Sequence, residues 1–220
     1  MAQKKLENLW QKGRKQMLND VTVFNIREYL SAKGDKDLGE DELRQLLSEF
    51  FCDKNPDVER FLKEQSIEFT KKNQSVTYLV FSNKDASLVG YFTLTIKPIT
   101  ISADSFSNTM KKKIARVSEL NEENGTYTLS AYLIAQLGKN YRDGANKKIT
   151  GTQLLNAAID TIKELQYMAG GMVIFLEAEN NEKLMHFYEA ENGFKQFDVR
   201  ETKSYHNEQP EQLIQLLKVM

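Results

Sequence analysis

The sequence predicts an α/β domain that is preceded by a helical N-terminal extension. Stretches rich in β-branched and aromatic residues, such as 75–82 and 170–179, are typical of strands. Stretches with apolar residues at helical spacing, such as 151–168, stand between them. No internal repeat, low-complexity tract or flexible linker separates these segments. We therefore expect one α/β domain.

The first third of the chain is expected to be mainly helical. Residues 3–18 form an amphipathic helical pattern, and residues 21–30 read as a strand that runs into a short helix. A helix over 39–51 has acidic residues in its first turn, which suits the helix dipole. A further helix is expected over 55–73, where Pro56 stands near the start.

Three strands are expected in the middle of the chain, over 75–82, 87–101 and 126–141. Pro98 cannot donate a backbone hydrogen bond, so it limits the second strand to an edge or an end at that point. The polar and highly charged residues 102–125 are expected to form a long excursion with one short helix.

The last third of the chain alternates between helices and strands. A helix over 151–168 precedes the apolar run 170–179, which is expected to be a strand inside the sheet. A short helix over 180–191 is followed by a turn and a strand over 192–200. Residues 211–220 fit either a last strand or a helix.

Composition argues against several classes of protein. The 30 Lys and Arg residues balance 31 Asp and Glu residues, so a broad basic surface for nucleic acid is not expected, although local basic clusters remain open. The single cysteine, Cys52, excludes an internal disulfide framework, and with two histidines it is too little for a typical zinc site. The N-terminus does not read as a signal peptide, and no apolar run reaches the ~18 residues of a membrane span. We expect a cytoplasmic, soluble protein without a metal.

Residues 144–155, GANKKITGTQLL, are expected to connect a strand to a helix. The first backbone N–H groups of a helix lack partners and lie at the positive end of its dipole, so such a turn suits a pyrophosphate. Gly151 would let that group approach closely. Hydroxyl groups and positive charge are available from Thr150, Thr152, Lys147 and Lys148. The alternative is a capped helix start with Thr150 near the N-cap; neither a P-loop nor a three-glycine dinucleotide motif is present.

The order of long strand, turn, helix, buried strand, short helix and Gly-Phe pair resembles the GNAT N-acetyltransferase superfamily. In that family a Gln/Arg-x-x-Gly-x-Gly/Ala turn holds the pyrophosphate of acetyl-CoA. By spacing, Asn146 falls on the Gln/Arg position, Ile149 on the first glycine and Gly151 on the second. Two of the three positions depart from the family pattern. Backbone N–H groups would still point at the diphosphate, because they do not depend on their own side chains.

Two further signatures carry the resemblance. NEKLMHFYEAENGF, residues 181–194, is similar to the family's Asn-x-x-Ala-x-x-Phe-Tyr…Gly-Phe, with Leu184 at the small position and one extra residue before the Gly-Phe pair. The matching residues are Asn181, Phe187, Tyr188, Gly193 and Phe194. Residues 50–81 and 88–99 resemble the toxin-like branch of the family, which acetylates the amino group of aminoacyl-tRNA. Together the resemblance covers about residues 48–218.

The resemblance implies a GNAT acyl-CoA N-acyltransferase fold, with a mixed central sheet flanked by helices. It divides the chain into an N-terminal helical extension with the first strand, 1–47, packed on the core, and an acetyltransferase domain, 48–220. The implied activity is direct transfer of the acetyl group of acetyl-CoA, the cosubstrate, to a primary amine. The residues implied to hold acetyl-CoA are Leu137, Gly138, Lys139, Asn146, Lys147, Lys148, Ile149, Thr150, Gly151, Thr152 and Asn181.

Tyr188 is implied to be the catalytic acid. A phenol with a pKa of about 10 can donate a proton to the leaving CoA thiolate. The alternative is a core residue on the same helix face as Leu184 and Phe187. Asn181 either caps the same helix or touches the pantetheine arm. The amides near Leu137 and Lys139 would face the thioester carbonyl.

Other features of the strand and its surroundings are less specific. Gly138 fits either a bulge or a close approach between backbone segments. No general base stands out, and most of the acidic candidates are expected on the solvated surface. These candidates are Glu119, Glu122, Glu123, Glu177 and Glu179.

A second hypothesis is a degenerate GNAT-fold module that binds CoA or a protein without catalysis, and Asn146 and Ile149 motivate it. For the enzyme, the acceptor is a small molecule, a protein or an aminoacyl-tRNA. The toxin-like branch implies aminoacyl-tRNA and a small antitoxin protein, and a homodimer is left open. The basic clusters that could contact RNA, or simply be solvated, are Lys71–Lys72, Lys111–Lys113 with Arg116, Lys139 with Arg142, and Lys147–Lys148.

Overall fold

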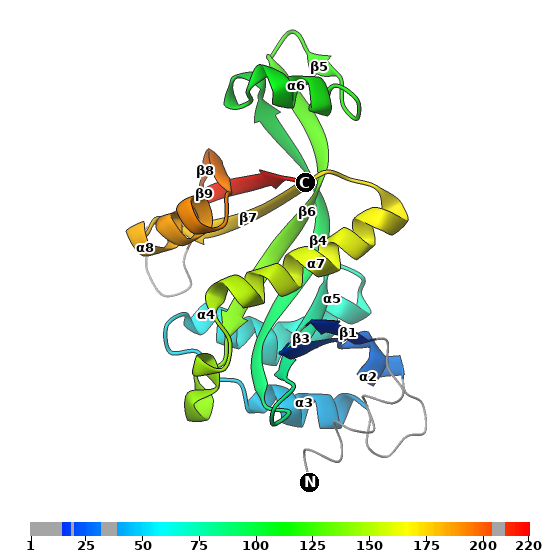
Figure 1. The fold of residues 1–220 in the computed structure, drawn as a ribbon, viewed down its shortest axis with the longest axis vertical. Coiled ribbons are helices and arrows are strands. Elements are labelled where there is room, and N and C mark those ends of the chain that lie inside the picture. Colours follow the sequence, from blue (N-terminus) through cyan, green and yellow to red (C-terminus); the bar gives the residue numbers. More distant parts are fainter. Residues whose placement is uncertain (1–14, 19, 32–38, 204–209) are drawn as a thin grey trace. The chain divides into compact units, whose positions relative to one another are not determined.

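The computed structural model describes residues 15–18, 20–31, 39–203 and 210–220 (Figure 1). By the density of its contacts the chain forms two compact units. The first consists of Met1–Thr95 and Ala135–Leu165, and the second of Ile96–Ile134 and Gln166–Met220. The boundaries between them fall inside two long strands and one long helix. No helix in the described part of the chain is long and apolar enough to cross a membrane.

The strands of the first unit follow the order β1-β2-β3-β4-β6. They are β1 (Lys15–Leu18), β2 (Val21–Asn25), β3 (Val76–Ser82), the first part of β4 (Leu88–Ser102) and the last part of β6 (Thr126–Lys139). The expected strands over 75–82, 87–101 and 126–141 are thus confirmed. Pro98 lies past Leu94, the last β4 residue paired with β3, as its missing N–H requires.

β1 corrects the prediction of a helix over 3–18. Residues 15–18 form a short strand whose register with β2 runs from Lys15↔Phe24 to Leu18↔Val21. The hydrogen bonds with β2 outweigh the helical spacing of the apolar residues. Four residues form only about one turn of a helix, whereas as a strand all four pair with β2. The remainder of that predicted helix lies outside the described residues.

The first unit also contains most of the helices. These are α2 (Arg27–Ser31), α3 (Glu40–Ser48), α4 (Pro56–Arg60), the π-helical turn η1 (Phe61–Gln65), α5 (Ser66–Lys71), the 3₁₀ segment η3 (Arg142–Lys147) and the main part of α7 (Gly151–Ala169). The segment α4–η1–α5 begins at Asn55, whose side chain accepts a hydrogen bond from the Val58 N–H at 3.2 Å, with Pro56 in the first turn. The helix predicted over 55–73 is therefore confirmed, with a π turn in its middle.

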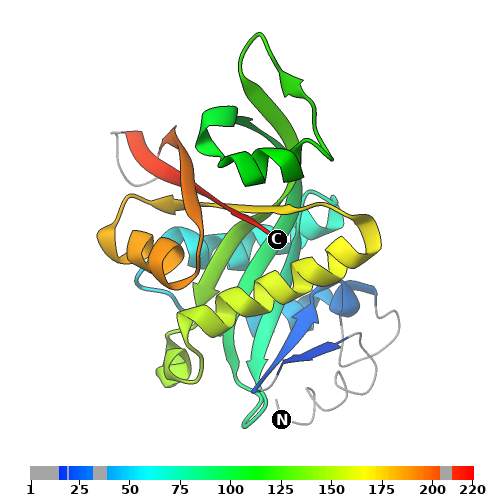
Figure 2. The same ribbon diagram turned by 45° about the horizontal axis from the view of Figure 1, so that its top comes forward.

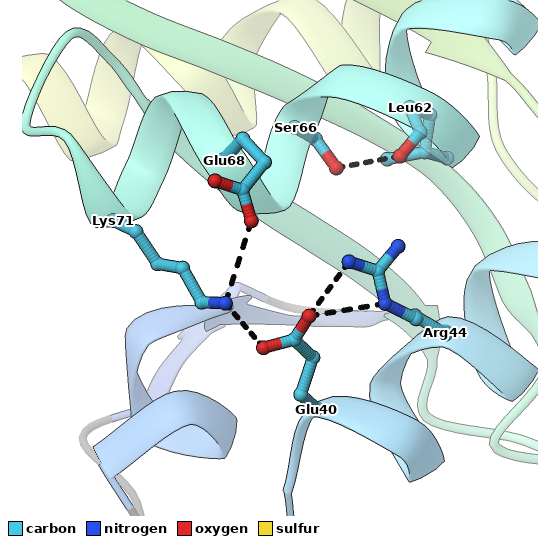
Figure 3. A network of polar contacts seen from close by, with 6 residues as sticks. All are labelled: Glu40, Arg44, Leu62, Ser66, Glu68 and Lys71. Carbon is cyan, nitrogen blue, oxygen red and sulfur yellow. Dashed lines mark hydrogen bonds and ion pairs between the residues drawn. The ribbon is translucent and has the colours of Figure 1, made fainter.

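The core of this unit gathers side chains from strands and helices. Phe24 on β2, Leu43 on α3, Leu62 on η1 and Tyr91 on β4 are all fully buried in one cluster. On the surface above it, Glu40 in α3 is bound by Arg44, at 2.6 Å, and by Lys71 of α5 (Figure 3). Exposed ion pairs contribute only about 0–1 kcal/mol each, so apolar burial is the main stabilising term.

The second unit has the strand order β4-β6-β7-β9-β8, and β5 pairs with β6 (Figure 2). Its further elements are η2 (Ala103–Ser105), α6 (Asn108–Ile114), β5 (Leu120–Asn121), β7 (Val173–Glu179), α8 (Glu182–Met185), the π-helical η4 (His186–Glu191), β8 (Lys195–Lys203) and β9 (Pro210–Val219). β7 is parallel to β6 and antiparallel to β9, so the sheet is mixed, as expected. The ambiguous segment 211–220 is a strand.

Candidate active site

The end of β6 passes close to its neighbours at Gly138. A Cβ atom at this position would lie 2.4 Å from Val58 Cγ1 and 3.3 Å from the Tyr91 ring. The Tyr91 hydroxyl donates to the Val58 carbonyl at 2.6 Å, which fixes both neighbours. On the adjacent strand, a Cβ at Gly90 would lie 2.8 Å from the Gly138 carbonyl oxygen. Gly138 is therefore required by close approach, one of the two roles expected for it.

Gly138→Ala is expected to destabilise the protein by about 1–3 kcal/mol, because the added methyl group overlaps Val58. Urea unfolding of the purified variant measures this loss. The matched comparison is the double variant Gly138→Ala/Val58→Ala, in which the overlapping atoms are removed. Its loss should be smaller than the sum of the two single losses. Additive losses would show that the two positions do not clash.

β6 continues beyond its pairing with β7. The parallel register runs from Ala131↔Val173 to Ile134↔Leu176, whereas β6 itself continues to Lys139. Residues 135–139 therefore lie past the last pair of that register, and they include two predicted acetyl-CoA residues, Leu137 and Lys139, both half-buried. Burial, and then the nearby Lys54, lower the pKa of the Lys139 ammonium group.

The turn after β6 is compact and contains two left-handed residues. Asp143 has φ of 50° and Gly144 has φ of 74°, inside the short segment η3. Ile149, at the family's first glycine position, buries its side chain and is only 2 % exposed. Because this side chain is directed into the protein, it leaves the surface of the turn open. Asn146 is half-buried in the same turn.

The start of α7 is closed by a capping box at Thr150. The Thr150 hydroxyl accepts from the Gln153 N–H at 3.0 Å, and the Gln153 side chain accepts from the Thr150 N–H at 2.8 Å. The capped-helix alternative is therefore correct as a description of Thr150. It does not use the N–H groups of Gly151 and Thr152, the first two residues of the helix, which have no intrahelical acceptor.

The two lysines of the turn differ in their surroundings. The Lys148 ammonium group is bound by Asp85 and lies 3.0 Å from the Ser87 hydroxyl. The Lys148 ammonium group and the Ser87 hydrogen bonds hold the pKa of Asp85 well below its usual range. Lys147 forms no ion pair with any residue in the described part of the chain.

A pocket of about 300 Å³ lies beside this turn. Its lining is polar and mostly charged. The lining residues are Asp20, Ser82, Lys84, Asp85, Lys147 and Lys148. Asp85 was missed by the sequence reasoning, because its partner Lys148 is 63 positions away and no local pattern marks the pair.

Tyr188 lies in the π-helical segment η4, His186–Glu191. A π turn contains one residue more than an α turn. This accounts for the extra residue that the sequence places between Tyr188 and the Gly193–Phe194 pair. The helix then ends on Gly193, with φ of 69°, and the Phe194 N–H donates to the Tyr188 carbonyl at 2.9 Å.

The Tyr188 ring packs edge-on against two other rings. Its centroid lies 4.9 Å from that of Phe187 and 5.9 Å from that of Phe194. Burial raises the pKa of Tyr188 to about 12, so the phenol keeps its proton at neutral pH. None of the residues that the structure describes forms a hydrogen bond with its hydroxyl. The ring is half-buried against these two rings, and its hydroxyl has no partner among the described residues.

The other predicted polar residues of the second unit have structural partners. The Asn181 side chain accepts from the Lys183 N–H at 3.0 Å and caps α8. Glu177, a candidate base, accepts from Arg200 at 3.2 Å and from the Gln215 side chain at 2.7 Å. Two donors therefore already bind this carboxylate. His186 is exposed and lies 3.7 Å from Glu191.

The remaining acidic candidates are surface residues, Glu179 among them. Glu119, Glu122 and Glu123 are exposed. Over residues 15–18, 20–31, 39–203 and 210–220, no group of three or more His, Cys, Asp or Glu side chains is placed to hold a metal ion. The structure thus adds no general base to the sequence-based candidates.

Solved structures with a similar fold include bacterial toxins. A Tyr-to-Phe mutant of KacT superposes with a TM-score of 0.57 at 18 % identity, covering 91 % of this chain and 95 % of KacT. AtaT complexed with acetyl-methionyl-tRNAfMet gives a TM-score of 0.56 at 17 % identity, covering 89 % and 94 %. A Tyr-to-Phe mutant of AtaT bound to acetyl-CoA and the C-terminus of the antitoxin AtaR gives 0.52 at 17 % identity, covering 91 % and 94 %.

Sequence comparison adds no closer relative. No protein-family model matches the chain, and no curated protein matches it significantly. The structural likeness extends over about nine tenths of the chain. The chain therefore has the GNAT fold, in the form found in the AtaT and KacT toxins.

Proposed function

We propose that the chain is an N-acetyltransferase that transfers the acetyl group of acetyl-CoA directly to a primary amine. The observation that carries the proposal is the course of the chain from β6 into α7. Strand residues past the last β7 pair lead into a helix whose first two N–H groups lack acceptors. The strand residues can form backbone hydrogen bonds with the extended pantetheine arm of acetyl-CoA. The start of the helix next to them can bind the diphosphate.

The residues at the turn fit the chemistry of a diphosphate. The N–H groups of Gly151 and Thr152 lie at the positive end of a helix of 19 residues. The buried side chain of Ile149 leaves the surface of the turn open. Lys147 supplies a positive charge that no described residue neutralises. Lys148 differs from this expectation, because Asp85 already binds it.

Tyr188 is proposed as the general acid. Acetyl-CoA supplies an activated thioester, and its thiolate needs a proton as it leaves. At neutral pH a phenol with a pKa of about 12 is fully protonated, and its hydroxyl has no partner among the described residues. Tyr188 can therefore donate that proton without breaking an existing hydrogen bond. N–H groups near Leu137 and Lys139 are proposed to polarise the thioester carbonyl.

The proposed acceptor is a primary amine, with the amino group of an aminoacyl-tRNA as the finer proposal. Support comes from the tRNA complex of AtaT, a protein of the same fold. On this chain the last turn of α6 carries Lys111, Lys112 and Lys113, a local basic group of the kind that contacts phosphates. By the same analogy an antitoxin protein is proposed as a partner, because AtaT binds the C-terminus of AtaR.

Regulated expression in a bacterium tests the aminoacyl-tRNA proposal. The wild-type protein is expected to arrest growth, and acetylated aminoacyl-tRNA should be recovered from the arrested cells. The matched control is Tyr188→Phe, expressed to the same level, which should permit growth. Harmless expression of a wild-type protein that acetylates other amines in vitro would contradict the tRNA substrate while leaving the transferase proposal intact.

The second candidate function is a module that binds CoA without catalysis. Two observations favour it. Asp85 forms an ion pair with Lys148, and Asn146 and Ile149 differ from the residues of the family's pyrophosphate turn. Calorimetric titration with acetyl-CoA and with CoA, followed by an acetylation screen, separates the two. Binding followed by turnover supports the enzyme, and binding without turnover on any amine supports the module. Failure to bind either ligand contradicts both.

A further inference from the structure

Asn140, the residue directly after β6, is a buried polar residue that joins three segments of the first unit. It is only 4 % exposed. Its side-chain Nδ2 donates to the Leu88 carbonyl at 2.9 Å. Its Oδ1 accepts from the Phe51 N–H at 3.0 Å and from the Arg142 N–H at 3.1 Å. One amide side chain thus binds the start of β4, the segment before α4 and the turn.

Backbone hydrogen bonds fix the chain at the same point. The Asn140 N–H donates to the Val89 carbonyl at 2.9 Å, and the Tyr141 N–H donates to the Phe51 carbonyl at 2.7 Å. Arg142, which the Asn140 side chain binds, is the first residue of η3. The direction in which the chain leaves β6 is therefore set before the two left-handed residues of the turn.

We propose that Asn140 is a positioning residue for acetyl-CoA, an inference that rests on the proposed function. It contacts the turn from the interior side and is not proposed to contact the ligand. By holding the Arg142 N–H, it sets the course of residues 142–150 and hence the positions of the free N–H groups of Gly151 and Thr152. Without it, the Phe51 N–H, the Arg142 N–H and the buried Leu88 carbonyl would lose their partner, and the turn can regain one only by moving.

Asn140→Ala tests this role. The Kd for acetyl-CoA is expected to rise by about tenfold, because displaced N–H groups no longer meet the diphosphate. The turnover number at saturating acetyl-CoA should stay within about twofold of wild type. Amide hydrogen exchange at residues 142–152 should become faster. Asn140→Asp keeps the acceptor for the Phe51 and Arg142 N–H groups but turns an oxygen toward the Leu88 carbonyl, so its changes should have the same sign as those of the alanine variant.

Thr77→Val is the matched control. It removes a buried hydroxyl that lies 2.8 Å from Thr93 between β3 and β4, in the same unit. This variant should lose stability without a change in the Kd or in exchange at the turn. Equal effects of Thr77→Val and Asn140→Ala would overturn the proposal, as would an unchanged Kd in Asn140→Ala. Should the alanine variant not fold, the aspartate variant provides the same comparison.

The proposal and the proposed function can fail separately. A wild-type protein that binds no acetyl-CoA would overturn the function. The exchange measurement would still decide whether Asn140 orders the turn: unchanged exchange at 142–152 in the Asn140 variants would contradict that, and selectively faster exchange would support it.

Discussion

Gly151→Glu is expected to raise the Kd for acetyl-CoA by about 100-fold or more. The substitution places a carboxylate at the first residue of α7, where the diphosphate is proposed to bind. Two like charges about 4 Å apart repel by about 4 kcal/mol near a protein surface, which exceeds the 2.7 kcal/mol of a 100-fold change. A carboxylate in the first turn favours the helix dipole, so the fold should survive. Calorimetric titration and a melting curve measure the two quantities.

Gly151→Gln is the matched control for this prediction. Glutamine has nearly the same size as glutamate and no charge, so the difference between the two variants isolates the electrostatic part. The glutamine variant is expected to bind acetyl-CoA more weakly than wild type and clearly more tightly than the glutamate variant. Wild-type affinity in Gly151→Glu would mean that the diphosphate lies elsewhere.

Tyr188→Phe is expected to lower the turnover number by about 100-fold, because the substitution removes the proposed proton donor and keeps the ring. Acetyl-CoA affinity should change little. The ring contacts with Phe187 and Phe194 do not involve the hydroxyl, so the melting temperature should also stay the same. Steady-state kinetics with varied acetyl-CoA separate the effect on kcat from the effect on binding.

Tyr188→Leu gives the corresponding test of the packing role. It removes both the hydroxyl and the ring contacts, so it should lower stability as well as turnover. A Tyr188→Phe variant with wild-type turnover would show that Tyr188 is a core residue and that another group protonates the thiolate.

The elements of the sheet could be predicted because their signals are local. β3, β4, β6 and β7 each show apolar and β-branched runs, and α7 shows apolar residues at helical spacing. β1 could not be predicted in this way. Its four residues have no strand pattern of their own. They form a strand because β2 provides backbone groups for hydrogen bonding.

The parts of the candidate site that depend on the conformation of the backbone could be predicted from residue type. Gly138 could be expected at a close approach, and Thr150 could be expected to cap α7, because each role depends on residue type. Contacts over a long sequence distance could not be inferred. The pairing of Lys148 with Asp85 and the hydrogen bonds of Asn140 to Phe51 and Leu88 join positions 50 or more residues apart. The π turn of η4 left one sequence signal, the extra residue before Gly193.

The most direct test of the central claim is transfer of a labelled acetyl group from acetyl-CoA by the purified wild-type protein. The acceptors are a panel of primary amines that includes aminoacyl-tRNA, peptides with free N-termini and small polyamines. The account predicts labelled amide product with at least one acceptor, formed about 100-fold more slowly by Tyr188→Phe. A wild-type protein that binds acetyl-CoA and labels none of these amines would contradict the account.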